Sequence, residues 1–338
     1  FQAYFKQKRD GSIFDEQMPV MAEVAAFCRA RQALCHRAEP VPQVALLLST
    51  AGHYRRINGL FNRDLSHVSG ALQALLECQL SVEVVGEHML AGRMAAYPLI
   101  VVPEWEYLEP QFRDALAGYA RNGGSLLLVG PKTAAMFQSA LGATADGAPS
   151  TEPCQLSHNG ASASLKGPIQ RVKFAEGVEG WGTLQSTGAA GPASAPAATV
   201  ARLGKGRIAA TWFNLGQSYV GARSAVMRQF AGDLARQLFP EPMVEVRGSA
   251  DVDVCVARKD GRLLVNLFGS ATPGVGPRDR STLAWFADGA LVEWRRFDRT
   301  YACSTDRHGR LLARDTSRQP PARHDLGLDA AGDVFLDQ

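Results

Sequence analysis

Short, uninterrupted apolar segments alternate with helical stripes in the first part of the chain, and this alternation limits the possible folds most. A segment that is apolar at every position is typical of a strand buried on both faces of a sheet. Residues 43–49 form such a run, and further strands are predicted at 82–85, 97–102 and 125–129, with helical stripes at 68–76 and 112–119. Because parallel strands need crossover connections, usually helices, this order predicts an α/β fold with an open, doubly wound sheet.

The segments around this core have weaker patterns. A helical stripe begins near Pro19 and ends before Pro40. Residues 142–200 are rich in Ala, Gly, Ser and Pro, which predicts an insertion of loops and small strands. Residues 199–214 predict a hairpin whose second arm returns to the main sheet, and residues 225–239 predict an amphipathic helix.

A β-module is predicted from residue 244 onward. Three valines at alternate positions precede the turn residues Lys259-Asp260-Gly261, as in a hairpin. Beyond residue 271 the pattern weakens, and only 289–297 and 301–312 are hairpin candidates. We therefore expect three parts: 1–38, an N-terminal segment and helix; 39–240, the α/β domain; and 241–338, a small β-domain with a poorly defined tail.

Charge and hydropathy exclude several classes of protein. The 338 residues are 46% hydrophobic and 20% charged, a globular rather than a disordered composition. The net charge of +3 gives no electrostatic case for a nucleic-acid partner, and no apolar run approaches the roughly 18 residues that cross a membrane. Since the first residue is Phe1, we expect a piece of a longer protein, and either a cytoplasmic or a periplasmic location stays open.

The cysteines do not form a metal-binding pattern. No C-x-x-C pair occurs, and none of the cysteines clusters with histidines, although zinc sites need closely spaced ligands. We therefore expect neither a metal nor another cofactor. The cysteines stand at positions 28, 35, 78, 154, 255 and 303, and the first three lie on helical stripes, where a free cysteine is usually a small hydrophobe.

Two strings imitate nucleotide-binding motifs. Residues 204–209 match G-x-G-x-x-A, but that fingerprint must join a strand to a helix, whereas strands are predicted on both sides here. Residues 124–133 resemble a P-loop, but the spacing is one residue too long and Pro131 lacks the N–H that a phosphate would need. We therefore expect a hairpin turn at the first string and a buried strand in the second.

The predicted sheet places a candidate site at the carboxyl ends of its strands, where ligands of open α/β sheets collect. Residues 51–58 follow the first strand and 103–107 follow the third. Their aromatic and charged side chains suit a subunit interface, a sugar site or ordinary loop packing, and these alternatives stay open. The candidate substrate or interface residues are His53, Tyr54, Arg55, Asn58, Trp105 and Glu106.

No catalytic group is predicted in this sheet. A nucleophile would stand at the elbow after the fourth strand, but that elbow is Gly130-Pro131-Lys132, and no base is evident near Thr133. Cys78 lies in or just after a helix, away from the elbow. Glu104 and Glu106 alternate on one extended segment and point the same way, which makes them a poor acid/base pair.

Two stretches resemble a known family. The stretches PVPQVALLLSTAGHYRR and YPLIVVPEWEYLEPQFRDALAGYARNGGSLLLVGP are similar to the class I glutamine amidotransferase-like domain of family 42 β-galactosidases and related glycosyl hydrolases, also called their trimerisation domain. The segment FKQKRDGSIFDEQMPVMAEVAAFCRARQALCHRAEP resembles the end of the catalytic barrel with its exit helix. The resemblance covers residues 1–140 well and extends more loosely, through LGKGRIAATWFNLGQSY, to about residue 268.

The resemblance implies a flavodoxin-like, amidotransferase-like sheet that has lost its catalytic triad. It also implies that the catalytic glutamates belong to a barrel outside this chain, so no catalytic residue carries over to any position here. The partners it implies are the protein's own barrel, further copies in a homo-oligomer that is often a trimer, and a carbohydrate substrate. We expect residues 53–58 and 105–106 to help wall a neighbouring active site.

The leading hypothesis is therefore the non-catalytic, oligomerisation-type portion of a glycoside hydrolase that acts on β-galactosides or related glycosides. One alternative is a carbohydrate-binding or assembly module. Another is an independent enzyme of the amidotransferase-like or ThuA-like class, which requires a reactive nucleophile.

Overall fold

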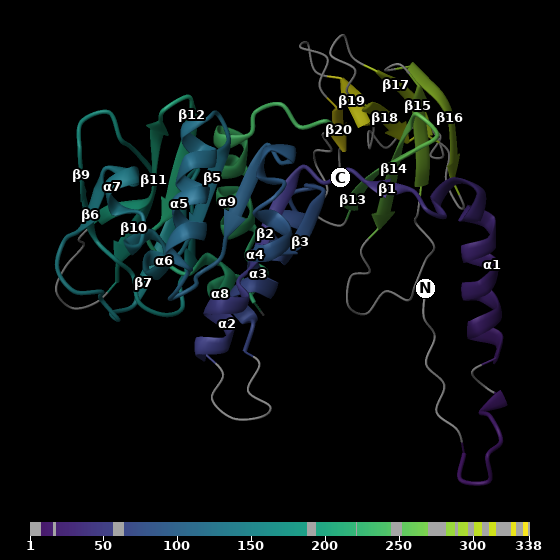
Figure 1. The fold of residues 1–338 in the computed structure, drawn as a ribbon, viewed down its shortest axis with the longest axis horizontal. Helices are drawn as coiled ribbons and strands as arrows, with labels where there is room; N and C mark the ends of the chain where they lie inside the picture. Colours follow the sequence, from purple (N-terminus) through teal and green to yellow (C-terminus); the bar gives the residue numbers. More distant parts are fainter. Residues whose placement is uncertain are drawn as a thin grey trace.

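The computed structural model describes residues 8–15, 18–56, 64–187, 194–220, 222–244 and 252–269 (Figure 1). From residue 267 onward it describes only the backbone of strands, and the later strands lie within 282–287, 290–296, 301–305, 311–315, 326–328 and 334–336. Asn58, one of the candidate site residues, lies outside the described residues.

A nine-stranded mixed sheet forms the centre of the molecule. Its strand order is β3-β2-β4-β5-β12-β11-β10-β7-β8. The first five strands in this order are parallel to one another: β3 (Val82–Gly86), β2 (Val44–Leu48), β4 (Leu99–Val102), β5 (Ser125–Val129) and β12 (Gly206–Thr211). The other four continue the sheet antiparallel: β11 (Ser194–Leu203), β10 (Glu179–Ser186), β7 (Cys154–His158) and β8 (Ala161–Ser164).

Helices cover the parallel part of the sheet. Every residue of β4 and β5 is buried, so both faces of the sheet are covered there. Helices α3, α8 and α9 pack against one another, and α3 and α9 also pack on the sheet, while α5 packs separately on β5 and β12 (Figure 1). The helices are α2 (Thr50–Arg56), α3 (Ser66–Leu76), α4 (Glu87–Leu90), η2 (Met94–Ala96), α5 (Pro110–Arg121), α6 (Pro131–Ala135), α7 (Gln138–Leu141), α8 (Leu215–Tyr219) and α9 (Ala225–Leu238).

These elements confirm the predicted α/β class and the four predicted parallel strands. The G-x-G-x-x-A string forms a hairpin turn, as predicted, because Gly204 has a φ of 62° between β11 and β12. The second arm of that hairpin, β12, returns to the main sheet beside β5.

The predicted insertion at 142–200 is more integrated than expected. Its strands β7, β8 and β10 extend the main sheet through antiparallel pairs, rather than forming a separate excursion. Only β6 (Ala143–Ala145) and β9 (Val172–Phe174) form a two-stranded sheet of their own.

A second sheet follows the α/β part, in the order β1-β13-β14-β15-β16. The turn at 259–261 joins its hairpin β13–β14, as predicted. Residues 290–296 form one strand paired with β15 instead of a hairpin of their own, whereas the hairpin expected near 301–312 is present as β17 and β18. The strands are β1 (Glu39–Pro40), β13 (Val252–Lys259), β14 (Arg262–Gly269), β15 (Thr282–Ala287), β16 (Ala290–Arg296), β17 (Tyr301–Thr305), β18 (Leu311–Asp315), β19 (Leu326–Leu328) and β20 (Val334–Leu336).

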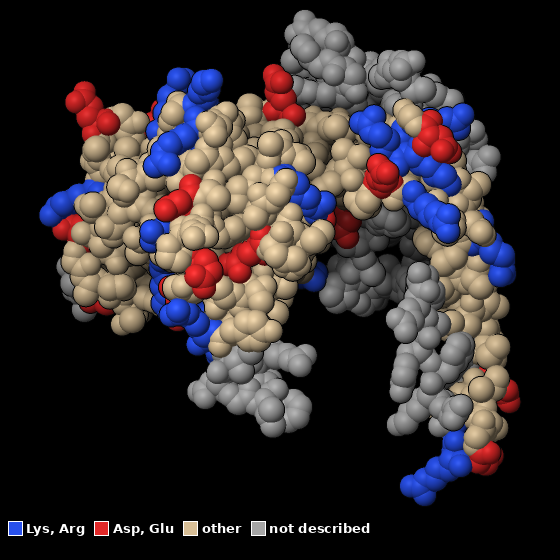
Figure 2. All heavy atoms as spheres, viewed as in Figure 1, with Lys and Arg blue, Asp and Glu red and all other residues tan. Residues whose placement is uncertain are grey.

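Helix α1 (Met18–Cys35) lies at the border of the molecule, beside the second sheet (Figures 1 and 2). Its only buried residue is Arg31, whose guanidinium stacks on Phe27 at 3.3 Å from the ring centroid. No helix in the part of the chain that the structure describes is long and apolar enough to cross a membrane.

Helices α3 and α8 touch through their glycines. A methyl group built on Gly70 would lie 1.9 Å from the backbone oxygen of Gly216, and one built on Gly216 would lie 2.1 Å from the backbone oxygen of His67. Since backbone cannot give way as a flexible side chain can, the two helices approach this closely only because both positions lack a side chain.

We expect Gly70→Ala to lower the free energy of unfolding by about 3 kcal/mol, because the new methyl group forces the helices apart in a packed region. Gly118→Ala is the matched control, since Gly118 is also helical and has open space around its Cβ position. That change should stabilise the protein by about 0.5–1 kcal/mol through helix propensity. Urea unfolding of both variants measures the difference, and equal midpoints would contradict the contact.

Candidate functional site

The carboxyl ends of β2 and β4 mark the point where the winding of the sheet reverses. The chain passes from β2 to its neighbour β3 on one side and then crosses to β4 on the other. Ligand sites of open α/β sheets lie at such a point. Side chains from α2, α3, the segment after β4, α6 and the end of β12 meet here, and we call them the carboxyl-edge cluster: Arg56, His67, Glu104, Trp105, Glu106, Lys132, Thr133 and Asn214.

Trp105 is the buried centre of this cluster. Its indole Nε1–H donates to the backbone oxygen of Leu47 at 3.2 Å, and its backbone N–H donates to Thr133 Oγ1 at 2.8 Å. The ring meets that of His67 edge-on, with 4.5 Å between centroids. Trp105 is fully buried, so its ring packs within this chain, as in the alternative of ordinary loop packing.

The elbow after β5 carries no available nucleophile. The Thr133 hydroxyl is fully buried and donates to the backbone oxygen of Pro103 at 2.8 Å. Gly130 has a φ of +109°, and a methyl group there would meet the side chain of Glu104 at 2.7 Å. The elbow is thus sharp, as in hydrolases, but its hydroxyl supports the neighbouring loop instead of facing solvent.

Glu104 is buried and held by the start of α6. Its Oε1 accepts a hydrogen bond from the backbone N–H of Lys132 at 3.1 Å. Burial raises the pKa of Glu104, while the hydrogen bond and the charge of Lys132 and a hydrogen bond from Asn214 act in the opposite direction. Arg56 donates to the backbone oxygen of Glu104 at 2.7 Å, so the residue is fixed at both ends.

Glu106 lies at the outer side of the same loop and is half exposed. The ammonium group of Lys132 donates to its carboxylate, which lowers the pKa of Glu106. Arg56 stands 3.7 Å from the same oxygen. Lys132 engages both carboxylates, Glu104 through its backbone N–H and Glu106 through its ammonium group. The segment was predicted to be extended, with both side chains pointing the same way, but Glu104 is buried and Glu106 is half exposed. This arrangement does not supply the free acid and base that glycoside hydrolysis needs.

His67 is buried beside a positive charge. Arg56 Nη1 lies 3.1 Å from its Nδ1, and the imidazole packs against Trp105. Burial, followed by the charge of Arg56, lowers the pKa of His67 to about 4. The ring is therefore neutral at neutral pH and can accept a hydrogen bond from the guanidinium.

The predicted residues on α2 lie at the surface. Tyr54 is 69% exposed, and its ring stands 6.4 Å from that of His53. The guanidinium of Arg55 lies over Tyr107 at 3.5 Å from the ring centroid. Together with Glu106, these residues form an exposed rim around the buried carboxyl-edge cluster.

The sequence gave Arg56 only as part of the segment 51–58 and Lys132 only as part of the elbow, and it gave no indication of His67 or Asn214. Asn214 lies three residues after the end of β12 and caps α8, so the same rule about carboxyl ends could have found it. His67 gave no signal, because its partners come from α2 and from the loop after β4. Within the described residues, no three His, Cys, Asp or Glu side chains gather as metal ligands do.

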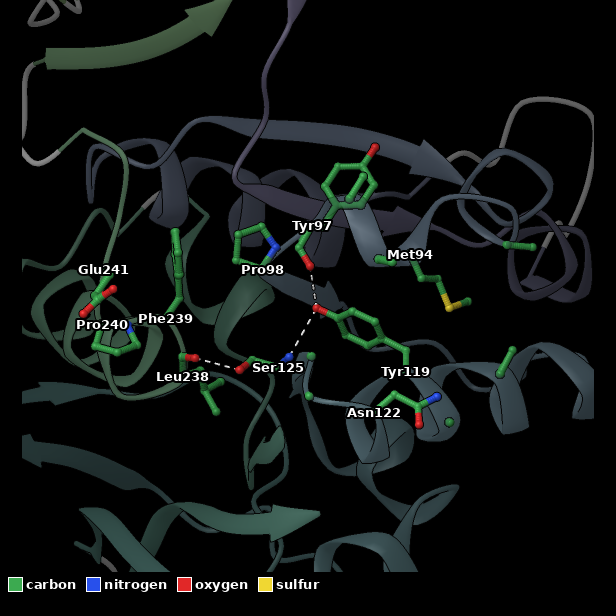
Figure 3. Close-up of a pocket in the computed structure, with 17 residues that line it drawn as sticks. Met94, Tyr97, Pro98, Tyr119, Asn122, Ser125, Leu238, Phe239, Pro240 and Glu241 are labelled. Carbon is green, nitrogen blue, oxygen red and sulfur yellow. Dashed lines mark hydrogen bonds between the residues drawn. The ribbon is translucent and has the colours of Figure 1, made fainter. Parts of the chain in front are cut away.

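A groove lies at the opposite edge of the sheet, where β4 and β5 begin (Figure 3). It encloses about 900 Å³ between η2, the end of α5 and the segment after α9. The Tyr119 hydroxyl in its wall donates to the backbone oxygen of Tyr97 and accepts from the backbone N–H of Ser125, whose own hydroxyl donates to Leu238. The hydroxyls of Tyr119 and Ser125 are thus both hydrogen-bonded within the chain.

Comparison with solved structures places the fold among glycosidases. A catalytic mutant of Gan42B, a GH42 beta-galactosidase from G. stearothermophilus, is 15% identical with a TM-score of 0.60, over 82% of this chain and 41% of that one. Alpha-L-fucosidase isoenzyme 2 from Paenibacillus thiaminolyticus is 14% identical with a TM-score of 0.62, over 82% and 47%. The beta-galactosidase from Bacillus circulans sp. alkalophilus is 11% identical with a TM-score of 0.56, over 84% and 42%.

The fold is therefore related to that of glycoside hydrolases. The chain spans about two fifths of the length of Gan42B, and less than half of the length of the other two. No protein-family model matches the sequence, and no curated protein matches it significantly.

The buried His67 predicts a loss of stability in acid. Its pKa is about 4 in the folded protein and 6.5 as the unperturbed value, so between these pH values the unfolded chain binds a proton that the folded chain does not. The free energy of unfolding should therefore fall as the pH decreases from 6.5 toward 4, by about 2 kcal/mol from this group. In His67→Gln this contribution is absent.

The measurement is urea unfolding of the wild type and His67→Gln between pH 7 and 4.5. Glu104, whose pKa is raised, contributes with the opposite sign: its proton favours the folded state, and that stability is lost as the pH rises through its folded pKa. This contribution is common to both proteins and cancels in their difference. Parallel stability profiles would contradict the assignment.

Proposed function

We propose that this chain is the non-catalytic portion of a glycoside hydrolase and that its α/β part serves assembly. The catalytic carboxylates would belong to a barrel domain outside these residues. The substrates would be β-galactosides or related glycosides, which is supported by the similar structures, a GH42 beta-galactosidase and an alpha-L-fucosidase. The order of the five parallel strands supports a flavodoxin-like, amidotransferase-like sheet as the basis of this role.

The observation that carries the proposal is that the reactive groups at the carboxyl edge are engaged within the chain. Thr133 supports the loop after β4, Glu104 accepts from the start of α6, and Glu106 pairs with Lys132. A catalytic acid or nucleophile must instead reach its substrate in a hydrogen-bonding geometry. These side chains hold the neighbouring loops together, which fits a domain that has an enzyme-like fold but no catalytic groups of its own.

The exposed rim of the cluster is the surface proposed for assembly. Tyrosine and arginine are enriched at interface hot spots because they combine a large apolar area with hydrogen-bonding ends. Tyr54 is exposed on α2, and Arg55 is held flat over Tyr107, which lowers the entropy that this side chain would lose on binding. A homo-oligomer built through this rim, for example a trimer, would place residues 53–55 and Glu106 against a neighbouring copy.

We expect the purified chain to elute as a multiple of its 36.3 kDa mass in size-exclusion chromatography with light scattering. The double variant Tyr54→Ala, Arg55→Glu should raise the dissociation constant at least about 100-fold, because it removes an anchor and reverses a charge. The control is Met89→Ala, which changes another exposed large side chain, on α4, and should leave the oligomer intact. A wild-type monomer at high concentration would contradict the assembly role.

The same proposal predicts no hydrolysis by this chain alone. Release of nitrophenol from nitrophenyl β-galactoside should stay at the buffer rate, and Glu104→Gln and Glu106→Gln should not change it, because the two carboxylates are not a catalytic pair. Turnover that either variant abolishes would overturn the proposal in favour of an enzyme.

Calorimetric titration with galactosides tests whether the chain is instead a carbohydrate-binding module. Heat that disappears in Tyr54→Ala would favour a carbohydrate-binding module, since an exposed ring can stack on a sugar face. An amidotransferase-like enzyme would instead need a reactive thiol, and burial raises the pKa of the Cys78 thiol to about 12, so iodoacetamide at neutral pH should leave this residue unmodified.

A further inference from the structure

The last turn of α1 is the part of this helix that packs on the second sheet. Leu34, Cys35 and Ala38 pack against Ala257 of β13 and Leu264 of β14, two residues that stand opposite each other in the hairpin. Nearby, the ammonium group of Lys259 donates to the backbone oxygen of Ala33 at 2.6 Å. The end of α1 therefore lies on one defined face of the β13–β14 hairpin.

That face carries a second cysteine next to the first. The Cys35 thiol lies 3.8 Å from Asn266 Oδ1 and donates to it, and Asn266 stands directly opposite Cys255 in the antiparallel register. Side chains of such opposed residues project from the same face, with Cβ atoms about 4.5–5.5 Å apart. Cys35 and Cys255 therefore flank one asparagine, although they are far apart in the sequence.

The alternation of β13 supports this placement. Val254 and Val256 are buried on one face of the strand, so Cys255, Ala257 and Lys259 project from the other, where α1 ends. Cys255 is exposed and Cys35 is half-buried. Burial raises the pKa of the Cys255 thiol, and the nearby Cys35 raises it further, as expected for two groups that compete to carry a negative charge.

The geometry points to a modification site: Cys35 and Cys255 form a dithiol that a small disulfide oxidises to an intramolecular bridge, which locks the end of α1 to β13. Cys35 is the last residue of the helix, and the turn that follows contains Arg37 at a positive φ of 59°, so bridging moves the end of the helix and not its whole length. For the bridge to form, the Asn266 side chain must rotate away from Cys35, which breaks the hydrogen bond between the thiol and Asn266 Oδ1.

Oxidised glutathione is a small disulfide that can act as the oxidant. The thiolate of Cys255, the more exposed of the two, attacks one glutathione sulfur, forms a mixed disulfide and releases one glutathione thiolate. The thiolate of Cys35 then attacks the sulfur of Cys255 and releases the second glutathione. Two protein thiols lose two protons and two electrons, and one glutathione disulfide becomes two thiols.

The titration of both thiols sets the pH dependence of the reaction. Burial raises the pKa of Cys35, while the charges of Arg31 on α1 and Lys259 on β13 act in the opposite direction. Since the net shift is upward for both cysteines, the thiolate fractions at neutral pH are small, and the rate of bridging should rise about tenfold per pH unit above neutrality.

The experiment treats the whole folded chain with oxidised glutathione, blocks free thiols with N-ethylmaleimide and maps non-reduced peptides by mass spectrometry. The expected result is one dominant internal link, between the peptides of Cys35 and Cys255. The bridge should also raise the melting temperature by about 5 °C, reversibly with dithiothreitol, because it closes a long loop in the unfolded chain.

Two variants make the result specific. Cys35→Ser should stop at a glutathione adduct on Cys255, whereas Cys28→Ser, which removes another half-buried cysteine of α1, should form the bridge as the wild type does. The inference is overturned if the wild type also stops at the adduct, or if Cys255 links only to other molecules or to Cys28. These outcomes do not depend on the oligomeric state or on any hydrolase activity, so they test this site separately from the proposed function.

Discussion

The buried indole of Trp105 fixes the path of the chain across the carboxyl edge of the sheet. Its ring nitrogen is bonded to β2, its backbone nitrogen is bonded to α6, and its ring packs against His67 of α3, so one residue joins three elements that are distant in the sequence. An unpaired polar group in such a place would cost about 1–3 kcal/mol, and here both donors of Trp105 are paired. Of its two neighbours in the chain, Glu104 is buried and Glu106 is half exposed.

This constraint also places the charged residues where they contact other groups of the chain. A carboxylate whose pKa is raised by burial is often a candidate catalytic acid, and Glu104 has that property. Its hydrogen bonds, however, go to the backbone of Lys132 and to Asn214, and Gly130 lacks a side chain where Glu104 passes. The shifted pKa therefore reflects the tight packing of a structural group, and the neutral His67 beside Arg56 has the same origin.

The sequence predicted the parallel sheet because its central strands are mostly apolar and alternate with helical stripes. It predicted the hairpin turn at Gly204 because strands stand on both sides. It could not show that Trp105 is buried, since the rule about carboxyl ends places a residue at an edge without saying which way its side chain points. That direction depends on the backbone oxygen of Leu47 and on Thr133, which are far away along the chain. The same limit explains the insertion: β7 and β10 contain many Ser, Gln and Thr residues, so their pattern did not reveal that they continue the main sheet.

Helix α1 has few contacts with distant parts of the chain, and most of its side chains are not buried. Packing of an apolar face normally supplies most of the stability of a helix in a protein. Val20 is 59% exposed, and Met18 and Phe27 are also exposed, so the first turns gain little from burial within the part of the chain described. The helix is held at its last turn, where the strand β1 pairs with β13 immediately afterwards. Any bond formed between Cys35 and Cys255 would therefore act at the position that already fixes the helix, and would strengthen that attachment without imposing a new direction on it.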